Sequence, residues 1–309
     1  MPAILTHYTF IKENRDNNDP DFDVMRLATQ GPDVFFFYGF VLKKRPNRRK
    51  VILFGRYLHR ANSVKPYLFL IEYAKASKLD WLYKYVNALF AHYVLDRNVH
   101  PYVYYKTGFH DDPKIQRKVF HNHHVEFEAV IDLIYSKERN TFVKPVKTIK
   151  VDKSKVKIVS KMFYELAKYV GYEGINEKTY YKAYKDMKFV QRVLYSRFGI
   201  KKTLFKIFGL RYPYCMSMPM KDKKYLKYDI LNKNKNTWFD CVENIERNES
   251  FYELVAKAKD ELHDIDILFE EWKDKDVDIK KLEEFINNID HTGFEVDAKK
   301  KYYKLYLEE

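Results

Sequence analysis

Hydrophobic positions recur at the spacing of an α-helix along most of the chain. One stripe comprises Trp81, Tyr85, Ala88, Leu89 and His92, and another comprises Val156, Val159, Phe163, Leu166 and Val170. Residues three or four positions apart share one face of a helix, so each stripe predicts an amphipathic helix. The second stripe ends just before Gly171, a residue type that commonly follows a helix.

Two further stripes lie near the C-terminus. One follows the sequence SFYE at 250–253 and ends at Trp272; Ser250 can cap this helix and Glu253 can reach back to the cap. The other ends before Gly293 and contains Ile279, Leu282, Ile286 and Ile289. With only nine Gly and ten Pro in 309 residues, a strand-rich and turn-rich fold is disfavoured. We therefore expect an all-α domain of many helices.

The composition changes at residues 140–155, which are rich in lysine and contain one aromatic residue, Phe142. Eight of the ten histidines precede this segment. We expect residues 1–140 to form a ligand-bearing helical half and residues 141–309 to form a helical C-terminal half. Helices on each side have faces to bury, so the two halves are expected to share one core in a single domain.

The formal net charge of +14 is compatible with nucleic acid or an anionic membrane surface as a partner. The lysines are spread along the chain, however, which fits a solvated lysine coat equally well. The N-terminus has no apolar core of signal-peptide length, and no window of about 18 apolar residues occurs. The two cysteines, Cys215 and Cys241, have no CxxC spacing, which favours a reducing compartment. We expect a soluble, cytoplasmic protein.

Three residues with metal-binding side chains, His92, Asp96 and His100, lie four positions apart. Counted at about 100° per residue from Trp81, they fall on the same arc as the apolar stripe of their helix. Buried His and Asp side chains cost several kcal/mol unless they are paired or bound to a metal. Because Pro101 disfavours helical geometry in the preceding residue, we expect His100 to lie at a frayed helix end.

A second pair, His124 and Glu128, repeats the spacing of four in HNHHVEFEAVIDLIY, with Asp132 one turn further on. One such pair often arises by chance, and a single inward histidine is usually a hydrogen-bonded core residue. Two pairs and His100 beside apolar faces favour a metal centre. Three residues upstream extend the set: His7 in THYTF, Asp33 in a Gly-Pro turn, and His59 in RYLHR.

The ordered series THY, GPD, LH, HxxxDxxxHPY and HxxxE, within residues 4–132, resembles the zinc-dependent phospholipase C family of bacteria. Weaker similarity continues through NTW at 236–238, SFYELVAKA at 250–258 and HTGFEVD at 291–297. The resemblance implies the all-α fold that this family shares with single-strand-specific P1-type nucleases. It also implies a centre of up to three zinc ions.

The resemblance implies three ligand sets. The first is Asp33, His59, His92 and Asp96; the second is His100, His124 and Glu128; the third is His7 with a bridging Asp96. In the secreted enzymes, the amine and carbonyl of an N-terminal Trp complete the third set. This chain has no Trp before Trp81, so we expect two zinc ions, and a third only where water or another group completes its site.

The implied activity is hydrolysis of the glycerol-phosphate ester of a phospholipid, releasing diacylglycerol and a phosphorylated head group. Asp33 would act as a ligand and as the catalytic proton acceptor. The choline-preferring enzymes have an aromatic residue directly after this Asp, whereas this chain has Val34, with Phe35, Phe36, Phe37 or Tyr38 as substitutes. A buried element start explains residues 34–38 equally well.

Two alternative functions remain open, and the sequence predicts no obligate protein partner. The chain could be another zinc phosphodiesterase such as a single-strand nuclease, although no compact nucleic-acid motif is present. It could also be a non-catalytic helical protein stabilised by metal, although structural zinc sites are usually closed and cysteine-rich. The segment KKTLFKIFGLRYPY at 201–214 fits either transient contact with an anionic membrane or a loop with a partly buried side.

Overall fold

A computed structural model describes residues 4–40, 45–110, 113–115, 119–196, 200–208 and 227–306. Nearly all regular structure within these ranges is helical, which confirms the all-α class. The strands found there are β1 (Trp238–Phe239) and β2 (Glu246–Arg247), which form one antiparallel pair. The helices up to residue 138 are α1 (Ile4–Asn14), α2 (Phe22–Ala28), the 3-10 helix η1 (Gly31–Phe37), α3 (Arg48–Arg60), α4 (Val64–Ser77), α5 (Asp80–Thr107), α6 (Pro113–Ile115) and α7 (His121–Glu138). The later helices are α8 (Pro145–Thr148), α9 (Lys153–Tyr169), α10 (Thr179–Leu194), α11 (Ile200–Ile207), α12 (Phe251–Trp272) and α13 (Ile279–Ile286).

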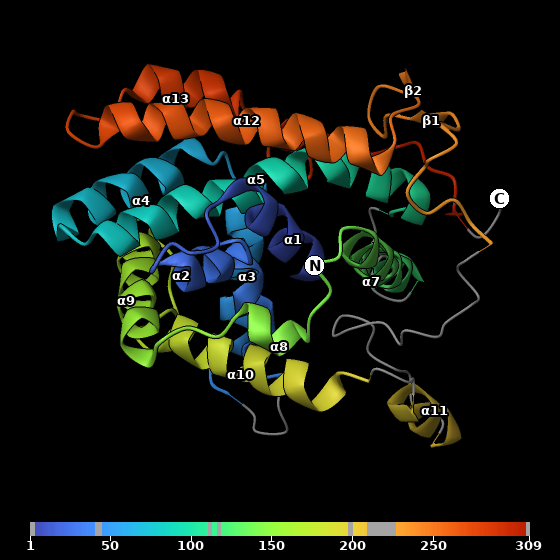
Figure 1. The fold of residues 1–309 in the computed structure, drawn as a ribbon, viewed down its shortest axis with the longest axis horizontal. Coiled ribbons are helices and arrows are strands. Elements are labelled where there is room, and N and C mark those ends of the chain that lie inside the picture. Colours follow the sequence, from blue (N-terminus) through green and yellow to red (C-terminus); the bar gives the residue numbers. More distant parts are fainter. Residues whose placement is uncertain are drawn as a thin grey trace.

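Helix α5 runs through the middle of the molecule, with α12 and α13 on one side and α1, α2 and α3 on the other (Figure 1). The rings of Phe90 on α5 and Phe269 on α12 lie 5.4 Å apart in an edge-to-face arrangement. Arg97 of α5 also forms an ion pair with Glu261 of α12 at 2.6 Å. Buried side chains from residues 1–140 and from residues 141–309 thus belong to one hydrophobic core. The division at residue 140 stays a prediction.

The capped helix near the C-terminus is confirmed, whereas the last predicted helix is shorter than expected: α13 ends at Ile286 and does not include Ile289. The backbone N–H of Glu253 donates to Ser250 Oγ at 3.3 Å, and the backbone N–H of Ser250 donates to Glu253 Oε2 at 2.9 Å. This capping box satisfies two N–H groups that the first turn of α12 would otherwise leave unpaired. In α9 the stripe residues Val156, Val159, Phe163 and Leu166 are buried as well, and the helix ends at Tyr169, so that Val170 follows it and is partly buried.

The prediction that His100 lies at a frayed helix end is wrong, because α5 continues through Pro101 to Thr107. Proline inside a helix costs about 3 kcal/mol. The turns after Pro101 offset this cost by packing, since Tyr102 and Val103 are buried in the core. His100 is therefore held in the interior of a regular helix.

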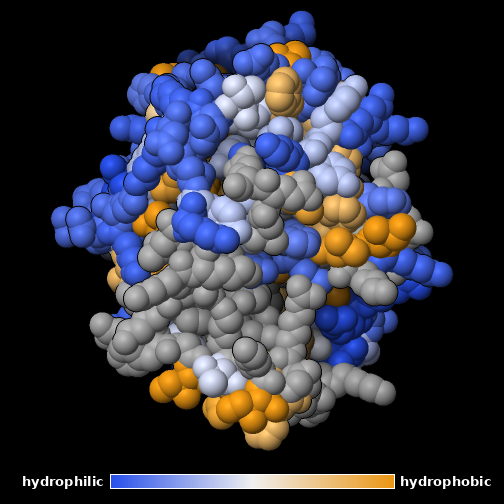
Figure 2. Space-filling model, turned by 90° about the vertical axis from the view of Figure 1, so that its right-hand side faces the viewer, coloured by the Kyte–Doolittle hydropathy of each residue, from blue (hydrophilic) through white to orange (hydrophobic). Residues whose placement is uncertain are grey.

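Among the described helices, none has the length and hydrophobicity of a transmembrane span. Helix α11 nevertheless has exposed apolar side chains, with exposed fractions of 63% for Ile200, 70% for Ile207 and 72% for Phe208, the residue after the helix. Figure 2 shows hydrophobic side chains at the lower end of the face on which α11 lies. Residues 209–214 of the predicted membrane segment lie outside the described residues, as does Cys215.

Candidate metal centre

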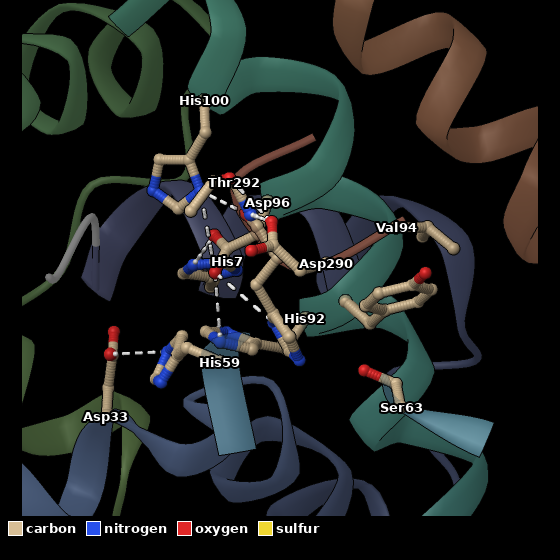
Figure 3. Close-up of polar contacts among 12 residues, drawn as sticks. His7, Asp33, His59, Ser63, His92, Val94, Asp96, His100, Asp290 and Thr292 are labelled. Carbon is tan, nitrogen blue, oxygen red and sulfur yellow. Dashed lines mark hydrogen bonds and ion pairs between the residues drawn. The ribbon is translucent and has the colours of Figure 1, made fainter. Parts of the chain in front are cut away.

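Asp96 lies at the middle of a buried group of histidines (Figure 3). Its Oδ1 atom is 3.3 Å from His7 Nε2, and its Oδ2 atom is 3.1 Å from His92 Nε2. His92 and Asp96 share one face of α5, as their spacing of four predicts, while His7 comes from α1. The structure thus brings together the bridging carboxylate and two of its predicted partners.

Asp33 and His59 form the neighbouring pair, with 3.1 Å between Asp33 Oδ1 and His59 Nε2. Asp33 is 3% exposed and lies in η1, where Gly31 has a φ of +47° and Pro32 occupies the first turn. A Cβ atom on Gly31 would lie 2.2 Å from Cδ2 of His92, so only glycine fits against this ring. The Gly-Pro turn therefore positions Asp33 for its pair with His59 and also packs against His92, which pairs with Asp96.

A second group forms between α5 and α7. His100 Nε2 is 3.4 Å from Glu128 Oε1, and His124 Nε2 is 3.2 Å from the same oxygen. All three ligand atoms lie within 4.8 Å of one another. The structure therefore gathers the three residues that the resemblance assigns to a second metal.

Asp132, one turn after Glu128 on α7, positions His7 indirectly, through hydrogen bonds to the two residues that precede His7. Its carboxylate accepts hydrogen bonds from the backbone N–H groups of Leu5 and Thr6, at 3.0 and 2.8 Å, and from Thr6 Oγ1 at 2.7 Å. These bonds satisfy N–H groups at the start of α1 and fix that helix against α7. Burial raises the pKa of Asp132 to about 7.

His291 belongs to the first group, although no motif of the sequence predicts it as a ligand. Its Nδ1 atom is 3.6 Å from Asp96 Oδ2, and the ligand atoms of His59, His92, Asp96 and His291 all lie within 4.8 Å of one another. Among the described residues, Asp33, which the resemblance places in this set, lies at ion-pair distance from His59 and from no other member of it. The histidines that surround Asp96 thus include one from the far end of the chain.

The turn that carries His291 is fixed by backbone contacts. The N–H of His291 donates to the carbonyl of His59 at 3.1 Å. A Cβ atom on Gly293 would lie 2.1 Å from the carbonyl oxygen of Arg97, whose helical donor is missing because Pro101 has no N–H. The sequence HTG at 291–293 could therefore have indicated a tight glycine turn that carries a histidine. No local pattern, however, indicates that this turn packs against α5.

The orientation of three imidazole rings leaves room for a proton or a metal ion beside each of them. Their Nδ1 atoms face main-chain carbonyl oxygens: His59 faces Gly55 (2.7 Å), His92 faces Thr29 (3.0 Å) and His100 faces His291 (2.6 Å). A carbonyl oxygen only accepts, so Nδ1 carries the hydrogen and Nε2 of the neutral ring has a lone pair. Each Nε2 faces a carboxylate oxygen, which is also an acceptor. A proton or a metal ion between the two atoms removes this repulsion.

The spacing of the ligand atoms fits zinc. Zinc–nitrogen bonds of about 2.0–2.1 Å in tetrahedral geometry place ligand atoms about 3.4 Å apart. Six pairs of imidazole nitrogen and carboxylate oxygen in the centre are 3.1–3.6 Å apart. Charge-assisted hydrogen bonds are shorter, at about 2.7–2.9 Å. The donor set of imidazoles and carboxylates without cysteine is typical of catalytic rather than structural zinc.

The charges of the centre favour a divalent cation. Burial raises the pKa of Asp96, but His92 and His100 outweigh it and hold that pKa well below its usual range. Burial lowers the pKa of His100, but Asp96 and Glu128 outweigh it and raise the value to about 9. Burial lowers the pKa of His291 to about 3, so this ring is neutral and can act as a ligand. One protonated imidazole thus faces two ionised carboxylates.

Phe36 lies at the edge of the metal centre. In the segment 34–38, it is the aromatic residue that stacks on a ligand, with its ring 5.4 Å from that of His59. Val34, Phe35 and Phe37 are buried in the core.

Comparison of the chain with protein-family models, curated proteins and solved structures finds no match.

Proposed function

We propose that this protein is a zinc-dependent phosphodiesterase of the phospholipase C type. It would hydrolyse the glycerol-phosphate ester of a phospholipid to diacylglycerol and a phosphorylated head group. The observation that carries the proposal is the buried centre in which imidazole nitrogens face the oxygens of Asp33, Asp96 and Glu128 at 3.1–3.4 Å. The lipid substrate itself is proposed from the motifs of residues 4–132.

The residues of the centre have separate roles in this proposal. Bound zinc would polarise the phosphoryl oxygens and lower the pKa of a water molecule. Asp96 would bridge the metal sites, and Asp33, buried beside His59, would accept the proton of the attacking water. As the phosphorus–oxygen bond to glycerol breaks, this proton can pass to the diacylglycerol oxygen.

Two surface features support a lipid substrate. Phe36 is half-buried beside His59 and would supply an aromatic face near the metals. It would take the role of the aromatic residue that the choline-preferring enzymes have at the position of Val34. The exposed apolar residues of α11, together with a net charge of +14, support transient contact with an anionic bilayer. Nucleic acid remains the less favoured partner.

The test begins with the protein purified without a histidine tag. We expect elemental mass spectrometry to find two or three zinc ions per chain, and a chelator to abolish hydrolysis of phosphatidylcholine vesicles. Addition of an anionic lipid to the vesicles should increase the rate. Full activity in the presence of chelator would exclude the metal mechanism.

Parallel assays separate the alternatives. Hydrolysis of single-stranded DNA without hydrolysis of lipid would identify a nuclease. Bound zinc without turnover of lipid, nucleotide or simple diester substrates would identify a metal-stabilised, non-catalytic protein. If no zinc binds, the inward histidines and carboxylates satisfy one another and the enzymatic proposal fails.

A further inference from the structure

The exposed apolar side chains of α11 lie on one face of that helix. Ile200, Leu204 and Ile207 follow one another at i, i+4 and i+7, and all three are exposed, as is Phe208 directly after the helix. A stripe with this spacing is usually buried against the core of a globular protein. Here it is exposed, on a helix that lies beyond the end of α10 at the edge of the molecule (Figure 1). Exposed apolar patches of this kind mark surfaces that bind a partner or a membrane.

Helix α10 extends this apolar surface. Phe189 and Val193 lie one turn apart on α10, and both are exposed. The end of α10 adjoins the start of α11, because Nζ of Lys201 donates to the carbonyl of Val193 and the backbone N–H of Lys201 donates to Ser196 Oγ at 3.1 Å. We call the exposed apolar side chains of the two helices the α10–α11 surface: Phe189, Val193, Ile200, Leu204, Ile207 and Phe208.

Basic residues border the α10–α11 surface. Lys188 and Arg192 directly precede its two apolar residues on α10, and neither forms an ion pair with a described residue. The acidic residue of α10, Asp186, is buried and already paired with Arg45, at 2.6 and 2.5 Å. Between Asp186 and Asp222 the sequence contains no acidic residue, whereas lysine and arginine recur. The charged residues of the segment that forms most of this surface are therefore all basic.

The surroundings of Lys188 are consistent with this excess of positive charge. Burial lowers the pKa of Lys188, and the positive charges of Arg192, Lys150 and Lys153 lower it further. Lys150 and Lys153 are exposed and form no ion pair with a described residue. Asp152, which lies between them in the sequence, caps α9 by accepting a backbone N–H at 2.7 Å. Lys188 thus lies among other cations, and an anion bound beside it would relieve their repulsion.

We propose that the α10–α11 surface docks on an anionic lipid bilayer, with its apolar side chains between the head groups and Lys188 and Arg192 at the lipid phosphates. A second copy of this chain would bring the same cations to the surface, so like-charge repulsion disfavours it. Nucleic acid would use the cations and aromatic rings but not the exposed isoleucine, leucine and valine side chains. The inference rests on the proposed function for the lipid substrate, but docking itself can be measured without turnover.

Docking at this surface would also orient the metal centre, because α10 packs against the element that carries Asp33. The ring of Tyr180 on α10 lies 5.5 Å from that of Phe35 in η1. The backbone N–H of Gly39, just after η1, donates to Asp186 Oδ2 of α10 at 2.9 Å. Since η1 contains Asp33, contact of α10 with a bilayer holds the centre in a defined orientation to the lipid.

The test is co-sedimentation of the full-length protein with phosphatidylcholine vesicles that contain or lack phosphatidylserine. The wild type should bind the anionic vesicles at least about tenfold more tightly, and added salt should weaken this binding. Ile207→Ser should weaken it about tenfold, because an apolar contact is lost, and Arg192→Gln about fivefold, because one cation is lost. Ile267→Ser and Lys257→Gln, at exposed positions of α12, are the matched controls and should bind like the wild type.

Binding of Ile207→Ser and Arg192→Gln to anionic vesicles with wild-type affinity would overturn the inference. Binding of the wild type to single-stranded DNA but not to vesicles would also overturn it, as would self-association that Ile207→Ser abolishes. A water-soluble diester separates docking from catalysis: Ile207→Ser should hydrolyse bis-nitrophenyl phosphate at the wild-type rate. Vesicle binding without hydrolysis of any diester would support the docking surface while contradicting the proposed function. Diester hydrolysis without vesicle binding would overturn the docking surface alone.

Discussion

The two metal-binding groups are built in different ways. His100, His124 and Glu128 come from two helices, α5 and α7, that are close in the sequence, and one pair lies at i and i+4. The group around Asp96 instead takes side chains from α1, α3, α5 and the turn after α13. The first construction can be recognised from local spacing alone. The second depends on how distant segments pack, and local spacing reveals only part of it.

The largest effect is expected from Asp96→Ala, which removes the carboxylate that His7, His92 and His291 surround. Because Asp96 Oδ2 also lies 3.9 Å from His100 Nδ1, we expect both groups to be weakened. Zinc should fall to one ion per chain or fewer, and hydrolysis should fall by at least about 100-fold. Elemental mass spectrometry and the vesicle assay measure the two quantities.

Asp264→Ala, at an exposed carboxylate on α12, is the matched control and should change neither quantity. Normal zinc content in Asp96→Ala would show that Asp96 is not a ligand. Complete loss of zinc would show that the two groups depend on each other in spite of their different construction.

A smaller effect is expected from His291→Asn, which tests the ligand that comes from the far end of the chain. The change should lower zinc content by about one ion per chain and leave the ion at His100, His124 and Glu128 in place. His263→Asn, at an exposed histidine on α12, serves as the control. Equal zinc in both variants would mean that His291 only supports the centre through its backbone contact to His59.

The smallest effect is expected from the pH dependence that Asp132 contributes. Its pKa is raised by burial from 3.8 to about 7, so between these values the folded protein binds a proton that the unfolded chain does not. Its contribution to the free energy of unfolding is therefore fully present below pH 3.8 and is lost as the pH rises through 7. Asp132 lies on the helix of the second group but positions His7 of the first, so this measurement shows how the two are coupled.

The measurement uses Asp132→Asn, which cannot titrate. We subtract the free energy of unfolding of the variant from that of the wild type. This difference should fall with rising pH by at most about 1.4 kcal/mol per pH unit, and should be constant above pH 8. Urea unfolding of chelator-treated protein avoids the pH dependence of metal binding itself. A difference that does not vary with pH would show that Asp132 titrates normally.

The sequence predicted the helices that have a clear apolar stripe or cap, such as the one that begins after Ser250, because these signals are local. It also predicted eight of the residues that the structure brings to the centre, because six of them lie in short motifs around His92, His124 and Asp33. It failed at Pro101, where core packing outweighs the local preference of the chain. It missed His291, because no spacing rule connects a turn near residue 291 with a helix 190 residues earlier.

The glycine turn at Gly293 also has a consequence for the order in which the molecule is assembled. Residues 100–128 can close the second group as soon as α5 and α7 pair, which requires only a short loop. The group around Asp96 has to wait for His291, near the end of the chain, and closing so long a loop costs more conformational entropy. A nascent chain that has not yet reached residue 291 can therefore hold one half of the centre, while the other half is completed only after that residue has been synthesised.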